Sequence, residues 1–304
     1  MGQRLDSKYV LVSPVKDEEK YIETTIKSVI CQTVRPARWI IVDDASRDGT
    51  PGIIRRYTEK FPWIEVLRLD RDSKRRIGFA EVRAFACGYR LIENVPHDFV
   101  VKLDCDLDLP DDYFENLITR LCEDERLGIC SGIYLEKNSR GWVPARLPDY
   151  HAAGASKVMR AACFRQIGGF VLCPGWDTVD EVRARAMGWK TCHFKEIPFY
   201  HLKPEGSGSG HLRTSLMCGE IDYLTGVGAH FVLLKSFHRM TVRKPILLRG
   251  FGLIAGFLKA FMLRKPKLVS AHEAKLYRQL LNRRMVEGIR RIGRILPRRV
   301  RAGN

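Results

Sequence analysis

The feature that most constrains the fold of this chain is a regular alternation of short apolar runs with helical segments. Four runs rich in β-branched and aromatic residues predict strands, at residues 9–13, 39–43, 64–68 and 99–103. Between the first two runs, residues 21–32 repeat apolar side chains at helical spacing. Strands that alternate with helices are typical of βαβ units. We therefore expect a Rossmann-like α/β fold, with a mainly parallel sheet and helices on both faces.

The charge of the chain is divided unevenly along its length. Its 52 Lys and Arg against 35 Asp and Glu give a formal net charge of +17. Residues 1–222 contain 33 side chains of each sign, whereas residues 223–304 contain 19 basic and 2 acidic ones. With 45% hydrophobic and 29% charged residues, the chain is globular rather than disordered. We predict an α/β domain over 1–222 and a basic helical tail over 223–304.

The cysteines and the N-terminus indicate the compartment. The nine cysteines form no CxxC pair and have no zinc-site spacing with histidine, which predicts buried free thiols in a reducing compartment. The first 15 residues lack the apolar stretch of a signal peptide. We therefore expect the α/β domain to be cytoplasmic.

Carboxylates follow three of the predicted strands at the points where those strands end. They are Asp17, Glu18 and Glu19 after the first strand, Asp43 and Asp44 after the second, and Asp104 and Asp106 after the fourth. In open α/β sheets, ligands bind outside the carboxyl ends of the strands. The sequence therefore predicts one acidic site at this edge of the sheet.

Two of these strand ends suggest particular chemistry. The triplet Asp104-Cys105-Asp106 presents two carboxylates, and Mg²⁺ or Mn²⁺ typically binds one or two carboxylates together with substrate phosphates. Capping of the following helix is the alternative role. Asp44 can accept hydrogen bonds from a nucleobase or a ribose hydroxyl, whereas Ser46 and Asp48 fit capping and turn roles. The three acidic strand ends together favour a metal site.

Taken in order, these motifs resemble the nucleotide-sugar half of family 2 inverting glycosyltransferases of the GT-A fold. The similar segments are residues 12–18, 28–33, 41–50 and 102–106, followed by 160–170 and 175–189. The last two are similar to the Gly-Gly-Phe and Glu-Asp acceptor segment of that family. The resemblance covers about residues 8–215. It implies a GT-A fold and a metal-dependent, inverting transfer from a nucleotide-diphospho-sugar, with UDP favoured.

The resemblance also implies roles for individual residues. Those that would bind the nucleotide are Ser13, Val15, Glu18, Asp44 and Asp104. Asp44 would contact the base and Asp104 would lie near the ribose. Asp106 would bind the Mn²⁺ or Mg²⁺ that bridges the diphosphate.

The catalytic base is expected just after the Gly-Gly-Phe segment. Asp177 matches the Asp of the family's Glu-Asp motif, which would take the proton of the acceptor hydroxyl as it attacks the anomeric carbon. Trp176 stands where the family usually has Glu. Asp180 lies one helical turn further on and is the alternative base. The spacing to Gly188 favours Asp177.

Two further segments could contact phosphate. His201 and Lys203 precede a glycine-rich stretch that could close over a diphosphate, with His201 completing the metal shell and Lys203 or Arg213 offsetting phosphate charge. An ordinary loop with a structural histidine is the alternative. After the third strand, Arg76 or Arg83 could reach a phosphate, and a solvated basic turn is the alternative.

The basic tail contains two predicted helices. Residues 245–263 carry only two charges, Arg249 and Lys259. At roughly 2.5–3.5 kcal/mol for a charge at the centre of a span, these disfavour full insertion, so we expect an interfacial or re-entrant helix supported by residues 230–238. The second helix places an apolar stripe on one side, formed by Tyr277, Leu281, Met285, Ile289, Ile292 and Leu296.

Basic amphipathic helices of this kind lie on anionic membranes. Nucleic-acid binding is one alternative, and packing of both helices as ordinary core is another. The neutral charge of residues 1–222 and the bulky apolar residues between the basic ones favour a membrane, so we expect no nucleic-acid partner.

We therefore predict a hexosyl- or N-acetylhexosaminyltransferase that acts on a lipid-linked or glycan acceptor at the inner face of the cell membrane, as in polysaccharide biosynthesis. One alternative is a nucleotidyltransferase that makes the activated sugar, but a glycine- and lysine-rich triphosphate loop is missing near the first strand. The other is a basic nucleic-acid-binding protein. It would leave the acidic strand ends without a purpose, because they repel phosphates.

Overall fold

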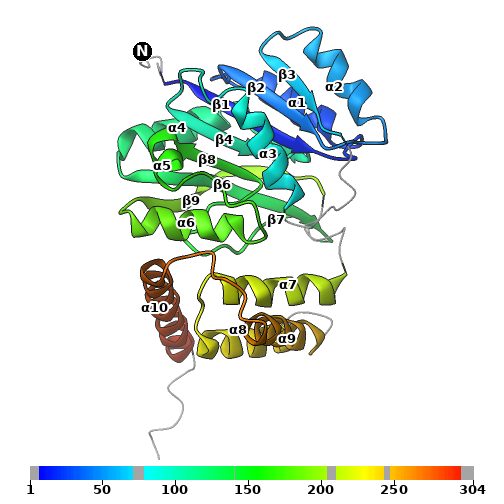
Figure 1. Cartoon of the computed structure of the whole chain (residues 1–304). Helices are drawn as coiled ribbons and strands as arrows, with labels where there is room; N and C mark the ends of the chain where they lie inside the picture. The colour runs from blue at the N-terminus through cyan, green and yellow to red at the C-terminus, as the bar shows by residue number, and fades with distance from the viewer. Residues whose placement is uncertain (1–6, 71–78, 140, 204–209, 243–246, 296–304) are drawn as a thin grey trace, which may run out of the picture. The chain divides into compact units, whose positions relative to one another are not determined.

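The structure is a computed structural model that describes residues 7–70, 79–139, 141–203, 210–242 and 247–295. It divides into two compact units, Met1–Gly208, here called the α/β unit, and Ser209–Asn304, called the helical unit (Figure 1). The sequence placed this boundary after residue 222. The structure differs because helix α7, His211–Leu224, packs against the C-terminal helix α9, Leu248–Met262.

The α/β unit is built on one mixed sheet. Its strands are β1 Tyr9–Val15, β2 Arg38–Asp43, β3 Ile64–Arg68, β4 Phe99–Leu103, β5 Leu107–Asp108, β6 Leu127–Asn138, β7 Gly141–Pro144, β8 Ser156–Arg160 and β9 Lys190–His201. The order is β3-β2-β1-β4-β8-β6-β9-β5, with β7 paired to β6. Strands β3, β2, β1 and β4 are parallel, as predicted. Strand β8 is antiparallel to β4 and β6, and β9 is parallel to β6.

Helices cover both faces of the sheet, which confirms the predicted α/β architecture. They are α1 Ile22–Ile30, α2 Thr50–Thr58, α3 Ala80–Arg90, α4 Tyr113–Glu123, α5 Ala161–Gln166 and α6 Trp176–Ala186. Alternate residues of β1 enter two separate hydrophobic clusters. Tyr9 and Leu11 pack with residues of α1, α2 and α4, whereas Val10 and Val12 pack with residues of α3 and α5. Burial on both faces explains why β1 is a nearly continuous apolar run.

Helix α3 lies unusually close to the sheet. A Cβ added at Gly88 would stand 2.6 Å from Val42 Cγ2 and 2.8 Å from Val12 Cγ1. The absence of a side chain at Gly88 therefore allows α3 to approach β1 and β2. This approach sets the N-terminal turn of α3, with Ala80 and Glu81, at the carboxyl ends of those strands.

The helical unit contains α7, α8 Ala229–Val242, α9 and α10 Ala271–Ile295 (Figure 1). A small core joins three of these helices and one connection, with Val227, Val232, Leu253 and Leu281 buried. Both helices predicted in the tail are present, although residues 245–246 lie outside the described ranges. Within those ranges, no helix is both long enough and apolar enough to cross a membrane.

The apolar stripe expected on the last helix packs inward where it can be seen. Leu281 is buried in the core of the helical unit and Tyr277 packs against the same cluster. Leu296 and the side chains of Ile289 and Ile292 lie outside the described residues. The described half of α10 therefore stabilises the unit from within, which corrects the expectation that its stripe is free for a membrane.

The cysteines are all free, as predicted. They are not all buried: Cys105, Cys130 and Cys163 are, whereas Cys31 and Cys122 are exposed. Cys31 directly follows α1 and Cys122 lies in the last turn of α4, where helix ends face solvent. The prediction of buried thiols is therefore correct for only three of the nine cysteines.

The close packing of α3 can be tested by adding one methyl group. We expect Gly88→Ala to lower the free energy of unfolding by about 1–3 kcal/mol, because the new Cβ overpacks the contact with Val12 and Val42. Gly52→Ala is the matched control, since its Cβ would meet nothing within 4 Å and alanine favours a helix by up to about 1 kcal/mol. Denaturant unfolding of both variants measures the difference. Equal stability of the two would contradict the close approach of α3.

Candidate functional site

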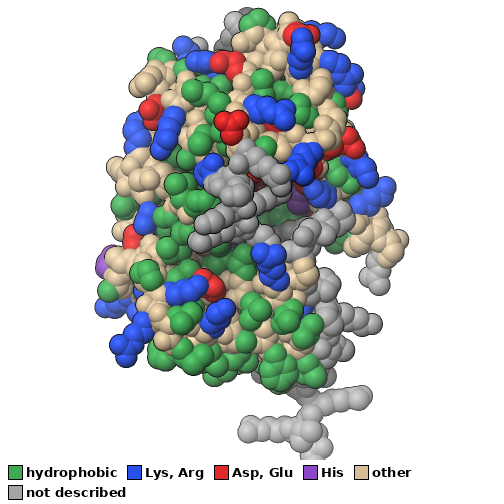
Figure 2. Space-filling view, turned by 45° about the vertical axis from the view of Figure 1, so that its right-hand side comes forward, with side chains coloured by type: hydrophobic (Ala, Val, Ile, Leu, Met, Phe, Trp, Pro, Cys, Tyr) green, Lys and Arg blue, Asp and Glu red, His purple; other side chains and the backbone are tan. Residues whose placement is uncertain are grey.

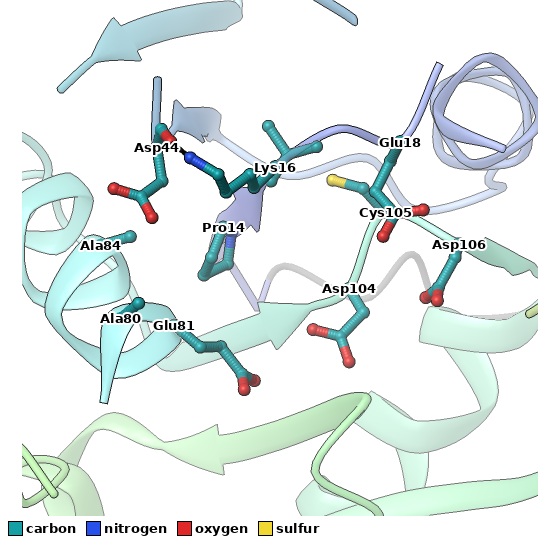
Figure 3. A pocket seen from close by; sticks show the side chains of 11 residues that line it. Pro14, Lys16, Glu18, Asp44, Ala80, Glu81, Ala84, Asp104, Cys105 and Asp106 are labelled. Carbon is teal, nitrogen blue, oxygen red and sulfur yellow. Dashed lines mark hydrogen bonds between the residues drawn. The ribbon is translucent and has the colours of Figure 1, made fainter. Parts of the chain in front are cut away.

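A pocket of about 210 Å³ opens at the carboxyl ends of β1, β2 and β4 (Figure 3). It is lined by Pro14, Val15, Lys16, Glu18, Asp44, Ala80, Glu81, Ala84, Asp104, Cys105 and Asp106. The structure thus gathers carboxylates from three strand ends and from the first turn of α3. The sequence predicted this position, because parallel strands align their carboxyl ends at one edge.

Interlocking hydrogen bonds hold the loops after β1 and β2. The Asp17 N–H donates to Ser46 Oγ at 3.0 Å, and the Glu18 N–H donates to Thr50 Oγ1 at 2.9 Å. Asp48 accepts the Thr50 N–H at 3.0 Å, so Ser46 and Asp48 have the capping and turn roles expected of them. The two loops therefore place Glu18 beside the end of β2.

Asp44 faces the pocket from the end of β2. The Lys16 ammonium donates to the main-chain oxygen of Asp44 at 2.7 Å rather than to its carboxylate. Figure 3 shows that the carboxylate points away from Lys16, on the side of Ala84. The Asp44 side chain is therefore directed at the space where a ligand would lie.

Ser13, expected in the same pocket, has a different position. Its side chain is fully buried and its Oγ accepts a hydrogen bond from Trp39 Nε1 at 3.0 Å. The residue lies inside β1, two positions before the strand ends at Val15. Its hydroxyl is therefore used to join β1 to β2 and does not line the pocket.

A buried lysine lies behind the pocket and contacts two of its carboxylates, Asp104 and Glu81. Lys102 Nζ lies 2.6 Å from Asp104 Oδ1, pairs with Glu81 and donates to the Gly154 carbonyl at 2.8 Å. Burial alone lowers the pKa of Lys102, but the Asp104 and Glu81 carboxylates outweigh it and raise the pKa above its usual value. Lys102 is therefore a fixed cation that joins the end of β4 to α3.

The carboxylates of the pocket are short of positive charge. Burial raises the pKa of Asp104 to about 7, and Lys102 offsets only part of this shift because Glu81 and Asp106 add negative charge. Burial also raises the pKa of Glu18, although Lys203 donates a hydrogen bond to it. Crowded carboxylates whose pKa values burial raises in this way favour a bound cation.

Asp106 and His201 are the pair predicted to hold a metal. His201 Nε2 lies 3.4 Å from Asp106 Oδ2, and the Asp106 contact raises the pKa of His201 although burial lowers it. The other polar atoms, Asp106 Oδ1 and His201 Nδ1, are buried without a hydrogen-bond partner. Two orphaned polar atoms fit a cation held by two protein ligands and by substrate oxygens. No three Asp, Glu, His or Cys side chains in the described ranges converge as a complete metal site.

A second buried lysine lies directly opposite the first. Lys102 on β4 pairs in register with Lys157 on β8, and the ring of Trp176 lies 5.2 Å from each ammonium group. Like charges that face each other across two strands destabilise a sheet unless they are paired. Here each lysine has its own carboxylates, and the Trp176 ring face adds a cation–π contact to both.

The contacts of Lys157 distinguish the two candidate bases, Asp177 and Asp180. It lies 2.8 Å from Asp180, which is 1% exposed, and also contacts Glu181 at 3.5 Å. Burial raises the pKa of Asp180 to about 7, and Lys157 opposes this shift. Asp177 is only half-buried and gives Lys157 its main-chain oxygen at 3.1 Å. Asp180 is thus enclosed by an ion pair, whereas the Asp177 carboxylate is accessible.

The remaining predicted contacts fall in several places. Lys203 is beside Glu18, while Arg213 lies on α7 of the helical unit. Arg83 lies on α3, and Arg76 and most of the glycine-rich stretch, residues 204–209, lie outside the described residues.

Sequence reasoning missed three charged residues of the site: Glu81, Lys102 and Lys157. For Lys102 a signal was available, since a lysine inside the buried apolar run of β4 needs a partner. Lys157 has the same signal in β8. Glu81 had none, because a glutamate in the first turn of a helix is common and only the close approach of α3 brings it to the pocket.

A scan of family models matches residues 10–172 to Glycosyl transferase family 2. Comparison with curated proteins gave no match. Among solved structures, the mannosyltransferase PcManGT from Pyrobaculum calidifontis, in complex with GDP-Man and Mn²⁺, is 16% identical. The alignment covers 93% of this chain and 82% of that one, with a TM-score of 0.53.

Two further structures are similar. TarS of S. aureus in complex with UDP-GlcNAc is 18% identical, with 84% of this chain covering 73% of that one and a TM-score of 0.54. GalNAc-T7 with UDP, GalNAc and Mn²⁺ is 15% identical, with 85% of this chain covering 56% of that one and a TM-score of 0.58. At these identities the likeness shows the fold, which is the GT-A fold.

The pairing of Lys157 gives a test of stability. We expect Lys157→Met to lower the free energy of unfolding by about 3–5 kcal/mol, because it leaves Asp180 and Glu181 buried without their cation. Lys195→Met is the control, since the Lys195–Asp149 pair is exposed and its loss should change nothing measurable. Thermal and urea unfolding measure both variants. Wild-type stability of Lys157→Met would show that the buried pair is not needed for the fold.

Proposed function

Because this chain belongs to glycosyl transferase family 2, we propose that it moves a sugar from a nucleotide-diphospho-sugar to a hydroxyl of its acceptor. The observation that carries the proposal is the acidic pocket at the ends of β1, β2 and β4. The carboxylates of this pocket would repel the phosphates of a nucleic acid, which disfavours nucleic-acid binding. The matched family is named for the transfer of glycosyl groups, which disfavours a nucleotidyltransferase that makes activated sugars. We favour a uridine donor, with a hexose or an N-acetylhexosamine as the sugar.

The nucleotide has a polar partner for each of its parts. Asp44, whose carboxylate is directed at the pocket, is placed to accept hydrogen bonds from the base, and Asp104 lies further along the pocket, where a ribose would follow. Val15 supplies apolar lining to the same pocket. Glu18 and Lys203 form an ion pair at the far side, where Lys203 is placed to offset diphosphate charge.

Asp106 and His201 are the residues that would hold a divalent cation, Mn²⁺ or Mg²⁺. Their orphaned polar atoms and the surplus of negative charge around them support this assignment. When bound, such an ion neutralises the charge that develops on the departing diphosphate. Asp106 and His201 themselves provide fixed ligands at the ends of β4 and β9, so the site needs little rearrangement to form.

Asp177 is the residue we assign as the catalytic base. The acceptor oxygen attacks the anomeric carbon as the bond from that carbon to the diphosphate oxygen breaks, and the acceptor proton passes to the Asp177 carboxylate. Its accessibility supports this role, whereas Asp180 is shielded by Lys157. The Trp176 ring contacts both Lys102 and Lys157, so it links the nucleotide pocket to the next residue of α6, Asp177.

For the acceptor we propose a lipid-linked or glycan intermediate at the inner face of the cell membrane. The support is the basic excess of residues 223–304, which favours an anionic surface. In this view the α/β unit carries the reaction and the helical unit keeps the enzyme peripheral to the membrane.

The nucleotide site is tested by calorimetric titration of UDP and GDP into the full chain, with and without Mn²⁺. We expect Mn²⁺ to tighten the binding of one nucleotide at least tenfold. This gain should disappear in Asp106→Ala, because the variant loses one of the two protein ligands, Asp106 and His201, that would hold the cation. Asp108→Ala, a nearby carboxylate that does not line the pocket, should bind as the wild type does. Binding that is indifferent to both Mn²⁺ and Asp106→Ala would contradict the proposal.

The base is tested by comparing Asp177→Asn with Asp180→Asn. We expect Asp177→Asn to lower kcat by about 10²–10⁴-fold with unchanged stability and nucleotide affinity, since it removes only the proton acceptor. Asp180→Asn should instead lower the melting temperature, because it removes the carboxylate nearest to the buried Lys157 and leaves only Glu181 at 3.5 Å. Donor turnover and thermal unfolding separate the two effects. Full turnover by Asp177→Asn would assign the proton transfer to another group.

A further inference from the structure

Helix α9 buries mainly small residues and exposes bulky apolar ones, which is the reverse of the usual arrangement. The residues it buries are Gly250, Gly252, Leu253, Gly256 and Ala260. On the opposite side it exposes Phe251, Leu258 and Met262, which recur at spacings of seven and four residues and so form one stripe. In a helix that packs in water, the bulky apolar side chains face the core instead.

Close packing against two neighbours explains the small face. A Cβ added at Gly256 would clash with the Leu216 carbonyl of α7, and one added at Gly250 would lie 2.6 Å from the Ser236 carbonyl of α8. Helices that pack through small residues in this way are typical of proteins in lipid, where burial of bulky apolar groups brings no gain. The large residues of α9 are thus left for the outside.

The exposed stripe continues onto α8. Phe251 is 59% and Met262 71% exposed, and on α8 Phe237 is 68% and Leu233 58% exposed. Figure 2 shows hydrophobic side chains gathered along the lower edge of the helical unit. A contiguous apolar surface of this kind marks an interaction site rather than ordinary surface. We call it the α8–α9 face.

Charge selects the partner of this face. Lys259 and Arg264 are exposed beside the end of the stripe. The two acidic residues of α7 are already paired, Asp222 with Lys235 at 2.8 Å and Glu220 with Lys265. The surroundings of the face are therefore basic, which complements an anionic surface.

We propose that the α8–α9 face docks on an anionic lipid bilayer, with α9 lying in the plane of the interface. The 15 residues of α9 rise only about 22 Å, short of the ~30 Å hydrocarbon core, so the helix lies along the membrane. Bulky apolar residues enter the acyl boundary, and Lys259 and Arg264 reach the headgroups. The proposal rests on the helical unit alone and holds whether or not the α/β unit transfers a sugar.

The test is flotation of the full chain with vesicles of phosphatidylglycerol and phosphatidylcholine. We expect the wild type to float and the double variant Phe251→Ser/Met262→Ser to partition at least tenfold less. Leu91→Ser/Met187→Ser is the matched control, because those residues are 51% and 50% exposed on the α/β unit, and it should float like the wild type. Circular dichroism and thermal unfolding confirm that each variant is folded, and UDP or GDP binding is measured on the same samples.

Three results would overturn the proposal. In the first, the folded double variant floats as well as the wild type, and in the second, neither protein floats. In the third, light scattering finds the wild type to be a dimer that the double variant splits, which assigns the face to a second copy of the chain. Loss of flotation with intact nucleotide binding separates this inference from the transferase, since Asp106→Ala should remove the Mn²⁺-dependent gain in nucleotide affinity and leave flotation unchanged.

Discussion

Two lysines buried opposite each other on β4 and β8 are the constraint on which the site depends. An ammonium group without water is costly, so Lys102 and Lys157 must each find carboxylates nearby. Lys102 draws α3 and the end of β4 together through Glu81 and Asp104, and Lys157 holds the start of α6 through Asp180. The acidic pocket and helix α6 are thereby fixed to neighbouring strands.

The same pairing explains how this chain accommodates Trp176 where the family usually has glutamate. The indole ring lies 5.2 Å from each of two cations, and its π-face is a suitable neighbour for both. Glu181 also accepts the Ala152 N–H at 2.7 Å and contacts His151 at 3.0 Å, so its charge is shared by three groups. The negative charge that the motif loses at position 176 is present elsewhere, at Asp180 and Glu181, but there it is structural. This leaves Asp177 as the accessible carboxylate of α6.

In the α/β unit the main constraint is buried charge, whereas in the helical unit it is exposed apolar surface. Glycines let α7, α8 and α9 approach closely, and this closeness leaves no room inside for Phe251 or Met262. The described part of α10 contributes Leu281 to the small core instead of facing outward. On α10, the apolar stripe of the sequence is the face that packs inward. The same rule applied to α9 would place its bulky apolar residues inside, whereas the structure exposes them.

The sequence by itself determined the order of strands and helices, the acidic ends of β1, β2 and β4, and the family, because these follow from local periodicity and from short motifs. It placed Val15, Glu18, Asp44, Asp104 and Asp106 at one edge correctly, since parallel strands bring their ends together. Only the tertiary structure decided that Ser13 bonds Trp39 of the neighbouring strand instead of lining the pocket, that Lys157 encloses Asp180, and that α9 turns its bulky side outward. These depend on strand register and on which helix face is covered, and periodicity reveals which residues share a face without revealing what packs against it.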